Sequence, residues 1–481
     1  MREKLLRNKK GITLIALVIT IIVLLILAGI SISMISSQDG ILKKATGAKE
    51  ANKKASEEEY AKLEIQAALI DGEGTIDVSK LTADSDIVKA YTDNGYTYKG
   101  EGKFISKNGD EEITITKEGN IEKIAVISDV SKLTTAMNET TKYVDNTSTI
   151  NKEAIIPRGF KVSSIAEEQK IDDGLVVIDK NGNEFVWVPV SKAIYDGATA
   201  IAVDTYTPMA KKIENTENYQ GILYDLNQTK ANQKVYNTYG VETLYYREPS
   251  LVTGSNSDKS ALLDTITGTK YDAQYYNLAG NYSDAKAFGK DMQEEYNNMV
   301  KSVAKYGGFY VGRYETGIDN TSKIAVSKNA TEKDEKGILK TTTADESLAD
   351  TNMWYGLYNK QRTMAKDNGL DSVESSMIWG SQYDAMMMWM QKKTETIIGT
   401  GYDTTKRNTE NITGSSSTDL INNVYDLYGC HLELTLESVL NSNRIYRGGH
   451  FNSDHAPSYR NRGTLEASPD DGSSRLSLYI K

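Results

Sequence analysis

The feature that most restricts the fold of this chain is an uncharged apolar stretch near its N-terminus. Between Gly11 and Ser37 the sequence GITLIALVITIIVLLILAGISISMISS has no charged residue, and five basic residues and one acid precede it. A helix of about 20 apolar residues crosses a hydrocarbon core of about 30 Å. The stretch therefore predicts a single membrane span over residues 12–36. Basic residues before it predict a cytoplasmic N-terminus, an extracellular remainder and a place at the bacterial cell membrane and cell surface.

The segment KKGITLIALVITIIVLLILAGI resembles the leader and first helix of type IV prepilins. The resemblance implies a leader over residues 1–11, cleavage between Gly11 and Ile12 by a prepilin peptidase, and other pilin subunits as partners. One position departs from the family, because Ala16 stands at the fifth mature position, where prepilins usually carry Glu. That Glu is thought to pair with a neighbour's N-terminal amine, and an unpaired amine in lipid is costly. An uncleaved single-span anchor is the alternative.

Small residues at three- and four-residue spacings follow the apolar stretch, and they predict that the helix continues outward as a stalk. This seam consists of Ile41, Ala45, Ala48, Ala51 and Ala55. The membrane and stalk helix is expected over residues 12–72, with Gly72 and Gly74 ending it. Residues 73–127 alternate apolar and polar positions between Asn-Gly and Glu-Gly turns, which predicts a small antiparallel meander of the pilin-like kind. The polar, Thr- and Asn-rich residues 128–154 are expected to be a linker.

From residue 155 to residue 481 short strands and turns alternate with a few helices, which indicates a large α+β domain. The segment GLVVIDKNGNEFVWVPV predicts a hairpin that turns at residues 180–183. A helix that ends at Gly307 is predicted by one apolar face, made of Phe288, Met292, Tyr296, Met299 and Val303. A second helix carries a methionine row, which is expected to pack in the core rather than bind a cofactor: Met386, Met387, Met388 and Met390.

Five segments of this domain occur in an order that resembles the formylglycine-generating-enzyme, or sulfatase-modifying-factor, family. They are EFVWVPV, FYVGRYETG, GSQYDAMMMWM, VYDLYGCHLELTLES and RIYRGGHF. The resemblance implies a C-type-lectin-like fold over residues 155–481, with residues 191–285 as an insertion. Active members hold Cu(I) with two thiolates, six and eleven residues after the Arg of Arg-Gly-Gly. Counting from Arg447 reaches Ser453 and Ser458, and because a serine hydroxyl does not replace a thiolate on Cu(I), the oxidase chemistry is expected to be lost.

Composition restricts the remaining chemistry. The formal charge of −10 argues against a nucleic-acid partner. One cysteine, Cys430, and three histidines argue against a multi-cysteine or His/Cys metal site, so neither a metal nor another cofactor is expected. His450, Asp454 and His455 lie close together in the sequence, but no helical spacing or third defined ligand accompanies them, so they too are not expected to bind a metal.

The C-terminal segment differs in composition from the rest of the chain. Among residues 444–480, Glu466 is the one member of the set Glu, Lys, Gln, Met and Trp. This bias, at the end of a domain of this kind, resembles the variable proteins of diversity-generating retroelements; chance in a loop that disfavours long side chains is the alternative. Short polar and aromatic residues are typical of adaptable binding surfaces. Arg447 and the two glycines after it are expected to fix the fold, and seven residues are expected to contact a ligand: His450, Asn452, Asp454, His455, Tyr459, Asn461 and Arg462.

These observations predict an α+β chain with a long N-terminal membrane and stalk helix, a small antiparallel sheet, and a large lectin-like domain. The predicted function is non-catalytic, surface-anchored binding or adhesion to an extracellular protein or glycan. A minor pilin or pseudopilin subunit is a structural alternative, which predicts cleavage after Gly11 and co-purification with filaments. A surviving formylglycine-generating oxidase is an enzymatic alternative, which predicts copper binding.

Overall fold

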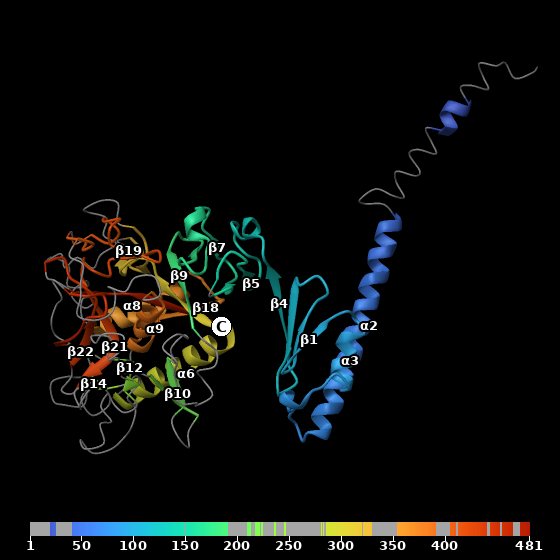
Figure 1. Cartoon of the computed structure of the whole chain (residues 1–481), viewed down its shortest axis with the longest axis horizontal. Helices are drawn as coiled ribbons and strands as arrows, with labels where there is room; N and C mark the ends of the chain where they lie inside the picture. Colours follow the sequence, from blue (N-terminus) through green and yellow to red (C-terminus); the bar gives the residue numbers. More distant parts are fainter. Residues whose placement is uncertain are drawn as a thin grey trace, which may run out of the picture. The chain divides into compact units, whose positions relative to one another are not determined.

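The structure is a computed structural model (Figure 1). It describes residues 20–25, 41–149, 151–190, 209–212, 217–221, 223–224, 235–236, 245–246, 280, 282, 285–319, 321–329, 354–390, 405–409, 412–439, 443–452, 455–464 and 472–481. The chain is mixed α+β with several sheets, and it divides into two compact units, residues 1–124 and residues 125–481.

The expected membrane span is corrected by the structure. Within the described residues, no helix combines the length and the apolar character that a membrane crossing requires. This finding contradicts the predicted long N-terminal membrane helix in the fold class, the membrane as a partner, and the location at the cell membrane and cell surface. Of the span expected over residues 12–36, residues 20–25 are described and are helical, whereas the expected cleavage site at Gly11 and Ile12 lies outside the described residues.

The first unit packs one long helix against a small sheet. The helices are α2 (Ile41–Asp71) and α3 (Asp86–Thr92), and the strands of the sheet lie in the order β1-β2-β3-β4 (Figure 1). The strands are β1 (Thr97–Gly100), β2 (Lys103–Ile105), β3 (Glu111–Ile115) and β4 (Ile121–Ile127), and a 3-10 turn, η1, covers Val78–Lys80. The β1–β2 and β2–β3 pairs are antiparallel. Helix α2 ends as expected at Gly72, whose N–H donates to the carbonyl of Ala68 at 2.9 Å.

The core of this unit uses a different part of α2 from the predicted seam. Ala48 and Ala55 are exposed, and burial begins near Ala61 and Ile65. These two residues pack in one cluster with Val88 and Phe104 from α3 and β2. The C-terminal half of α2 is therefore the part that buries its apolar side chains, because that half has a sheet and a second helix to pack against.

Residues 128–154, expected to be a linker, belong to the second unit and contain regular structure. The turn η2 (Val130–Leu133), strand β5 (Thr141–Val144) and the start of strand β6 (Glu153–Ile156) lie in this stretch. The last residues of β4, residues 125–127, pair in parallel with β5, and β5 pairs antiparallel with β6. Polar side chains in this stretch form hydrogen bonds with nearby residues. The Asp145 carboxylate accepts hydrogen bonds from the N–H and the hydroxyl of Thr147 at 2.8 and 2.6 Å.

The main sheet of the second unit has the order β18-β25-β15-β9-β8-β7, and every neighbouring pair in it is antiparallel. Its strands are β7 (Lys161–Val162), β8 (Val176–Ile178), β9 (Glu184–Pro189), β15 (Gly308–Gly312), β18 (Val373–Met377) and β25 (Leu476–Ile480). The β8–β9 pair confirms the predicted hairpin. The C-terminal strand β25 lies between β15 and β18, next to the edge strand of this sheet.

A second sheet carries the C-terminal hairpin, with the order β14-β21-β22-β23 and β24 paired in parallel with β21. Its strands are β14 (Tyr245–Tyr246), β21 (Leu432–Val439), β22 (Asn443–Arg447), β23 (Arg460–Thr464) and β24 (Gly472–Ser474). The described residues of this unit also form short strand pairs: β10 (Ala210–Lys212) with β11 (Tyr219–Gly221), β12 (Leu223–Tyr224) with β13 (Val235–Tyr236), β16 (Gly317–Ile318) with β17 (Ala325–Val326), and β19 (Leu420–Ile421) with β20 (Val424–Tyr425).

Within its described residues, this unit has three α-helices: α6 (Ala285–Tyr306), α8 (Trp354–Asp367) and α9 (Gly380–Met390); a 3-10 turn, η3, covers Ala166–Glu168 (Figure 1). The predicted apolar face of α6 is confirmed, because all five of its residues are fully buried. Gly307 follows α6 at φ 80°, a left-handed conformation that favours glycine, and its N–H donates to the Val303 carbonyl at 2.7 Å. The methionine row of α9 is also buried, as predicted for core packing.

Candidate functional site

The connection between β22 and β23 is fixed at its base by a buried group of four charges. Arg447, the last residue of β22, pairs with Asp384 of α9, and its Nη1 lies 3.6 Å from Glu437 of β21. Arg460, the first residue of β23, places Nη2 3.2 Å from Asp384 and 3.1 Å from Glu437. Two guanidinium groups thus face two carboxylates, all four at most 6 % exposed, so the buried charges balance.

Burial and the opposite charges of this group act on the pKa values of its members in opposite directions. Burial raises the pKa of Glu437, and Arg460 and Arg447 oppose that rise. Burial acts to lower the pKa of Arg447, but the carboxylates of Asp384 and Glu437 outweigh it, so the pKa of Arg447 is raised. The Arg447 guanidinium also lies 4.7 Å from the centre of the Tyr383 ring. The base of the connection is therefore held by α9, β21, β22 and β23 together.

The two glycines after Arg447 are required by close contacts, which confirms that this segment fixes the fold. A Cβ on Gly449 would lie 2.0 Å from the Tyr428 carbonyl oxygen. Gly448 has φ 81°, and a Cβ there would lie 3.0 Å from the Tyr383 hydroxyl. The N–H of Gly449 donates to the Leu427 carbonyl at 3.0 Å. The chain therefore passes close to Tyr428 and Tyr383 before it reaches the predicted contact residues.

The predicted contact residues lie in different environments. His450 is buried, which differs from the expectation that it is displayed, because its ring packs 4.3 Å from the Phe451 ring and its Nδ1 lies 2.6 Å from the Asn452 side-chain oxygen. Asn452 is exposed. His455 and Tyr459 are partly exposed and stack with ring centres 3.8 Å apart and planes at 15°. The structure therefore brings together two aromatic contact candidates at the surface.

The other predicted residues are described in part or not at all. Asn461 and Arg462 lie on β23, opposite Tyr446 and Ile445 of β22, and their side chains are outside the described set. Asp454 and Ser453, which the resemblance placed at a copper-ligand position, also lie outside the described residues. The second such position, Ser458, is 1 % exposed and so cannot contribute to a contact surface.

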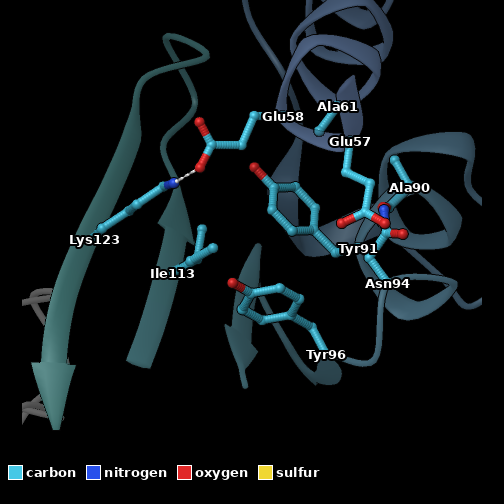
Figure 2. A pocket seen from close by; sticks show the side chains of 9 residues that line it. All are labelled: Glu57, Glu58, Ala61, Ala90, Tyr91, Asn94, Tyr96, Ile113 and Lys123. Atoms are coloured by element: carbon cyan, nitrogen blue, oxygen red, sulfur yellow. Dashed lines mark hydrogen bonds and ion pairs between the residues drawn. The ribbon is translucent and has the colours of Figure 1, made fainter. Parts of the chain in front are cut away.

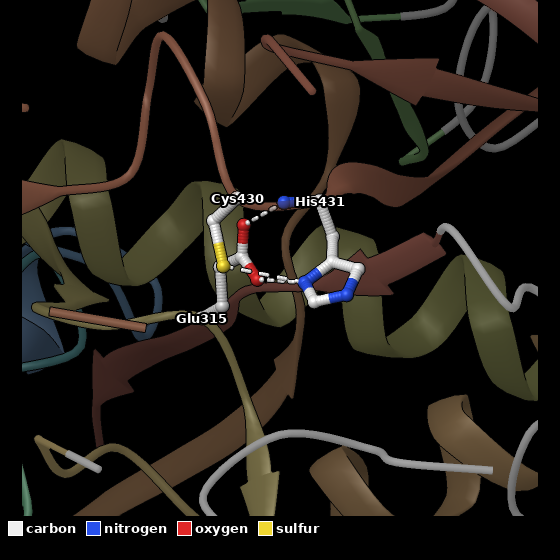
Figure 3. A group of neighbouring side chains, drawn as sticks. All are labelled: Glu315, Cys430 and His431. Atoms are coloured by element: carbon white, nitrogen blue, oxygen red, sulfur yellow. Dashed lines mark hydrogen bonds and ion pairs between the residues drawn. The ribbon is translucent and has the colours of Figure 1, made fainter. Parts of the chain in front are cut away.

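A second cluster, which the sequence analysis did not find, joins Glu315, Cys430 and His431 (Figure 3). Glu315 follows β15, and the other two residues lie between β20 and β21. The imidazole Nδ1 of His431 lies 3.1 Å from Oε2 of Glu315 and 3.3 Å from Sγ of Cys430. The backbone N–H of His431 donates to Oε1 of Glu315 at 2.9 Å. All three side chains are buried. In the sequence, the adjacent residues Cys430 and His431 were the one available sign of this cluster.

Further buried carboxylates surround the cluster. Burial raises the pKa of Asp426 to about 8 and that of Asp419 to about 6, and hydrogen-bond donors around each carboxylate act in the other direction. Burial, together with the charge of Glu315, also raises the pKa of the Cys430 thiol well above its ordinary value. Cys430 is therefore a protonated, buried thiol rather than a reactive thiolate in the metal-free protein.

Among the described residues, one cavity is small and another is an open groove. In the first unit, a pocket of about 30 Å³ has room for about one water molecule, and Figure 2 shows the side chains that line it: Glu57, Glu58, Ala61, Ala90, Tyr91, Asn94, Tyr96, Ile113 and Lys123. Lys123 closes one side by an ion pair with Glu58 at 2.5 Å. In the second unit, an open groove of about 350 Å³ lies along α6 and β25, where Lys481 pairs with Glu374 at 2.9 Å. Neither holds a cluster of catalytic side chains.

Comparison with known proteins gives no relative for this chain. No protein-family model, no curated protein and no solved structure matches it. The expected assignments to the type IV pilin and formylglycine-generating-enzyme families, with their implied partners, are therefore not supported. The short motifs behind those assignments occur here without a detectable match of the chain as a whole.

Proposed function

We propose that the second unit is a non-catalytic binding domain whose recognition surface lies on the β22–β23 connection. One observation carries this proposal: the stacked His455 and Tyr459 rings are partly exposed on a connection whose two ends, Arg447 and Arg460, are fixed by the same two buried carboxylates. A rigid base lowers the entropy lost on binding, and a rigid aromatic pair offers contact area at low conformational cost.

The residues at the surface of the connection suit a polar ligand with an apolar face. Ring faces stack on the apolar faces of sugars or on side chains, and the Asn452 amide both donates and accepts hydrogen bonds. A protein or a glycan provides this chemistry.

Glycan and protein arrays probed with the full-length chain test this proposal. The wild-type chain is expected to bind a restricted set of ligands, and the His455→Ala/Tyr459→Ala double variant is expected to lose at least about tenfold in affinity, because stacked aromatic anchors dominate such surfaces. Tyr60→Ala is the matched control, because Tyr60 is a half-exposed tyrosine on α2, far from the connection in sequence. Equal binding by the double variant and the control would remove the connection from the proposal.

A further inference from the structure

The cluster of Glu315, Cys430 and His431 provides three different metal-ligand atoms at one buried point. A carboxylate oxygen, a thiol sulfur and an imidazole nitrogen all lie within 4.8 Å of one another. Figure 3 shows the Cys430 sulfur and the Glu315 carboxylate on the same side of the His431 ring, facing Nδ1. Sulfur, nitrogen and oxygen together form a donor set typical of zinc.

The arrangement does not fit a nucleophilic cysteine. In a Cys-His-carboxylate relay, one ring nitrogen faces the thiol and the other faces the carboxylate. Here both the Cys430 sulfur and the Glu315 carboxylate lie against the same nitrogen, Nδ1 of His431. Because one nitrogen cannot pass a proton from one partner to the other in that way, the geometry favours three atoms that converge on a shared ion.

The distances agree with a zinc tetrahedron after a small adjustment. Zinc bonds of about 2.3 Å to sulfur and about 2.0–2.2 Å to nitrogen or oxygen place neighbouring ligand atoms about 3.3–3.6 Å apart. The observed separations from Nδ1 are 3.3 Å to sulfur and 3.1 Å to oxygen. These two pairs of atoms need to separate by only a few tenths of an ångström, and the Cys430 sulfur and the Glu315 oxygen lie within 4.8 Å of each other. The imidazole needs to carry its proton on Nε2 so that Nδ1 can bind.

The charges around the cluster also favour a cation. Asp419, Asp426 and Glu433 are fully buried, and each interacts electrostatically with Glu315 or with Cys430. Arg475 pairs with Glu433 and so offsets one of these carboxylates. A divalent ion at Glu315 would lower the electrostatic cost of ionising these buried carboxyl groups, at a point where a low dielectric strengthens the attraction.

We propose that Glu315, Cys430 and His431 bind one Zn²⁺ ion, which ties the segment after β15 to the segment between β20 and β21. Binding replaces the S–H bond of Cys430 with a Zn–S bond and releases the proton to solvent. Water supplies the fourth ligand. The site serves to stabilise the second unit, and it adjoins the β22–β23 connection, because the Phe451 N–H donates to the Cys430 carbonyl at 2.8 Å.

Metal titration of the full-length protein tests this site. The protein is stripped with a chelator and titrated with Co²⁺, which reports thiolate ligation by a sulfur-to-metal charge-transfer band, and then with Zn²⁺ as competitor. One Co²⁺ per chain is expected, with the band present and displaced by Zn²⁺. Cys430→Ser is expected to remove the band, and His431→Gln or Glu315→Gln to weaken Zn²⁺ binding at least about tenfold.

Glu374→Gln is the matched control for Glu315→Gln, because Glu374 is a half-exposed carboxylate on β18 in the same unit, and its Zn²⁺ affinity is expected to equal that of the wild type. The wild-type titration decides the question even where a variant does not fold. A wild-type protein that binds no metal, or binds Co²⁺ without a sulfur band, would overturn the proposal. Equal Zn²⁺ affinity of Glu374→Gln and Glu315→Gln would exclude Glu315 as a ligand and so contradict the site as stated.

Discussion

Arg475 forms an ion pair with both carboxylate oxygens of Glu433, with its Nε 3.0 Å from one oxygen and 3.1 Å from the other. The same guanidinium donates to the Gly312 carbonyl at 2.9 Å and to the Tyr425 carbonyl at 2.8 Å. One fully buried side chain just before β25 therefore connects β21, β15 and β20. The two sheets of the second unit meet at this residue.

Replacement of Arg475 by Met is expected to lower the free energy of unfolding by about 3–5 kcal/mol, because it leaves the Glu433 carboxylate buried without its partner. Chemical denaturation measures this change. The control is Lys481→Ala, which removes a pair between half-exposed side chains and is expected to cost less than about 1 kcal/mol. Equal losses in the two variants would mean that the buried pair contributes no more than a surface pair.

Asp426 is expected to make stability fall as pH rises. Burial raises its pKa to about 8 from the ordinary value of 3.8. Between these values the folded state holds a proton that the unfolded state releases, so its contribution to the free energy of unfolding decreases by about 1.4 kcal/mol per pH unit and is lost above about pH 8.

Denaturation at a series of pH values, in the presence of a chelator, measures this dependence. Asp426→Asn is expected to reduce the slope between pH 5 and pH 8, because it removes the titrating group. Asp371→Asn, at an exposed carboxyl of the same unit, is expected to keep the wild-type slope. A slope in Asp426→Asn as steep as that of the wild type would show that Asp426 does not hold the proton.

Gly449→Ala is expected to destabilise the protein by at least about 3 kcal/mol, because the added Cβ would meet a backbone oxygen, which cannot rotate away as a side chain can. Thermal or chemical denaturation of the variant measures the loss. Gly109→Ala is the comparison, because Gly109 has φ 72° and open space around it. The added Cβ there meets no atom, so this variant is expected to lose only the about 1–2 kcal/mol that a left-handed conformation costs. A Gly449 variant no less stable than the Gly109 variant would contradict the tight passage beside Tyr428.

Phe288→Ala is expected to cost about 3–5 kcal/mol, since Phe288 is fully buried on α6 and its ring contacts the rings of Tyr282, Trp354 and Tyr358. Ile165→Ala serves as the control, because Ile165 is 51 % exposed and its truncation leaves no cavity. Comparable denaturation midpoints for the two variants would place Phe288 outside the core.

Local patterns predicted the elements that depend on neighbouring residues. The apolar face of α6 and the glycine after it depend on helical spacing, and the β8–β9 hairpin depends on a short turn, so both were predicted from the sequence. The linker prediction for residues 128–154 was wrong, because β5 is stabilised by its neighbours β4 and β6 rather than by an apolar pattern of its own.

Contacts between distant residues could not be predicted in this way. Glu315 and His431 are separated by 116 positions, and no local pattern in the sequence shows that they meet. The surroundings of His450 depend in the same way on a distant contact, because the residue before it, Gly449, passes the Tyr428 carbonyl. The expected membrane helix rested on an uncharged apolar stretch and the basic residues before it, and within the described part of the chain no helix has the required length and apolar character.

Hydrogen–deuterium exchange of the full-length chain, with and without a ligand identified on the arrays, is the most direct test of the central claim. If the β22–β23 connection is the recognition surface, the ligand should slow exchange within residues 450–459 more than anywhere in the first unit. Unchanged exchange in that connection, with protection confined to another segment, would show that the ligand binds elsewhere.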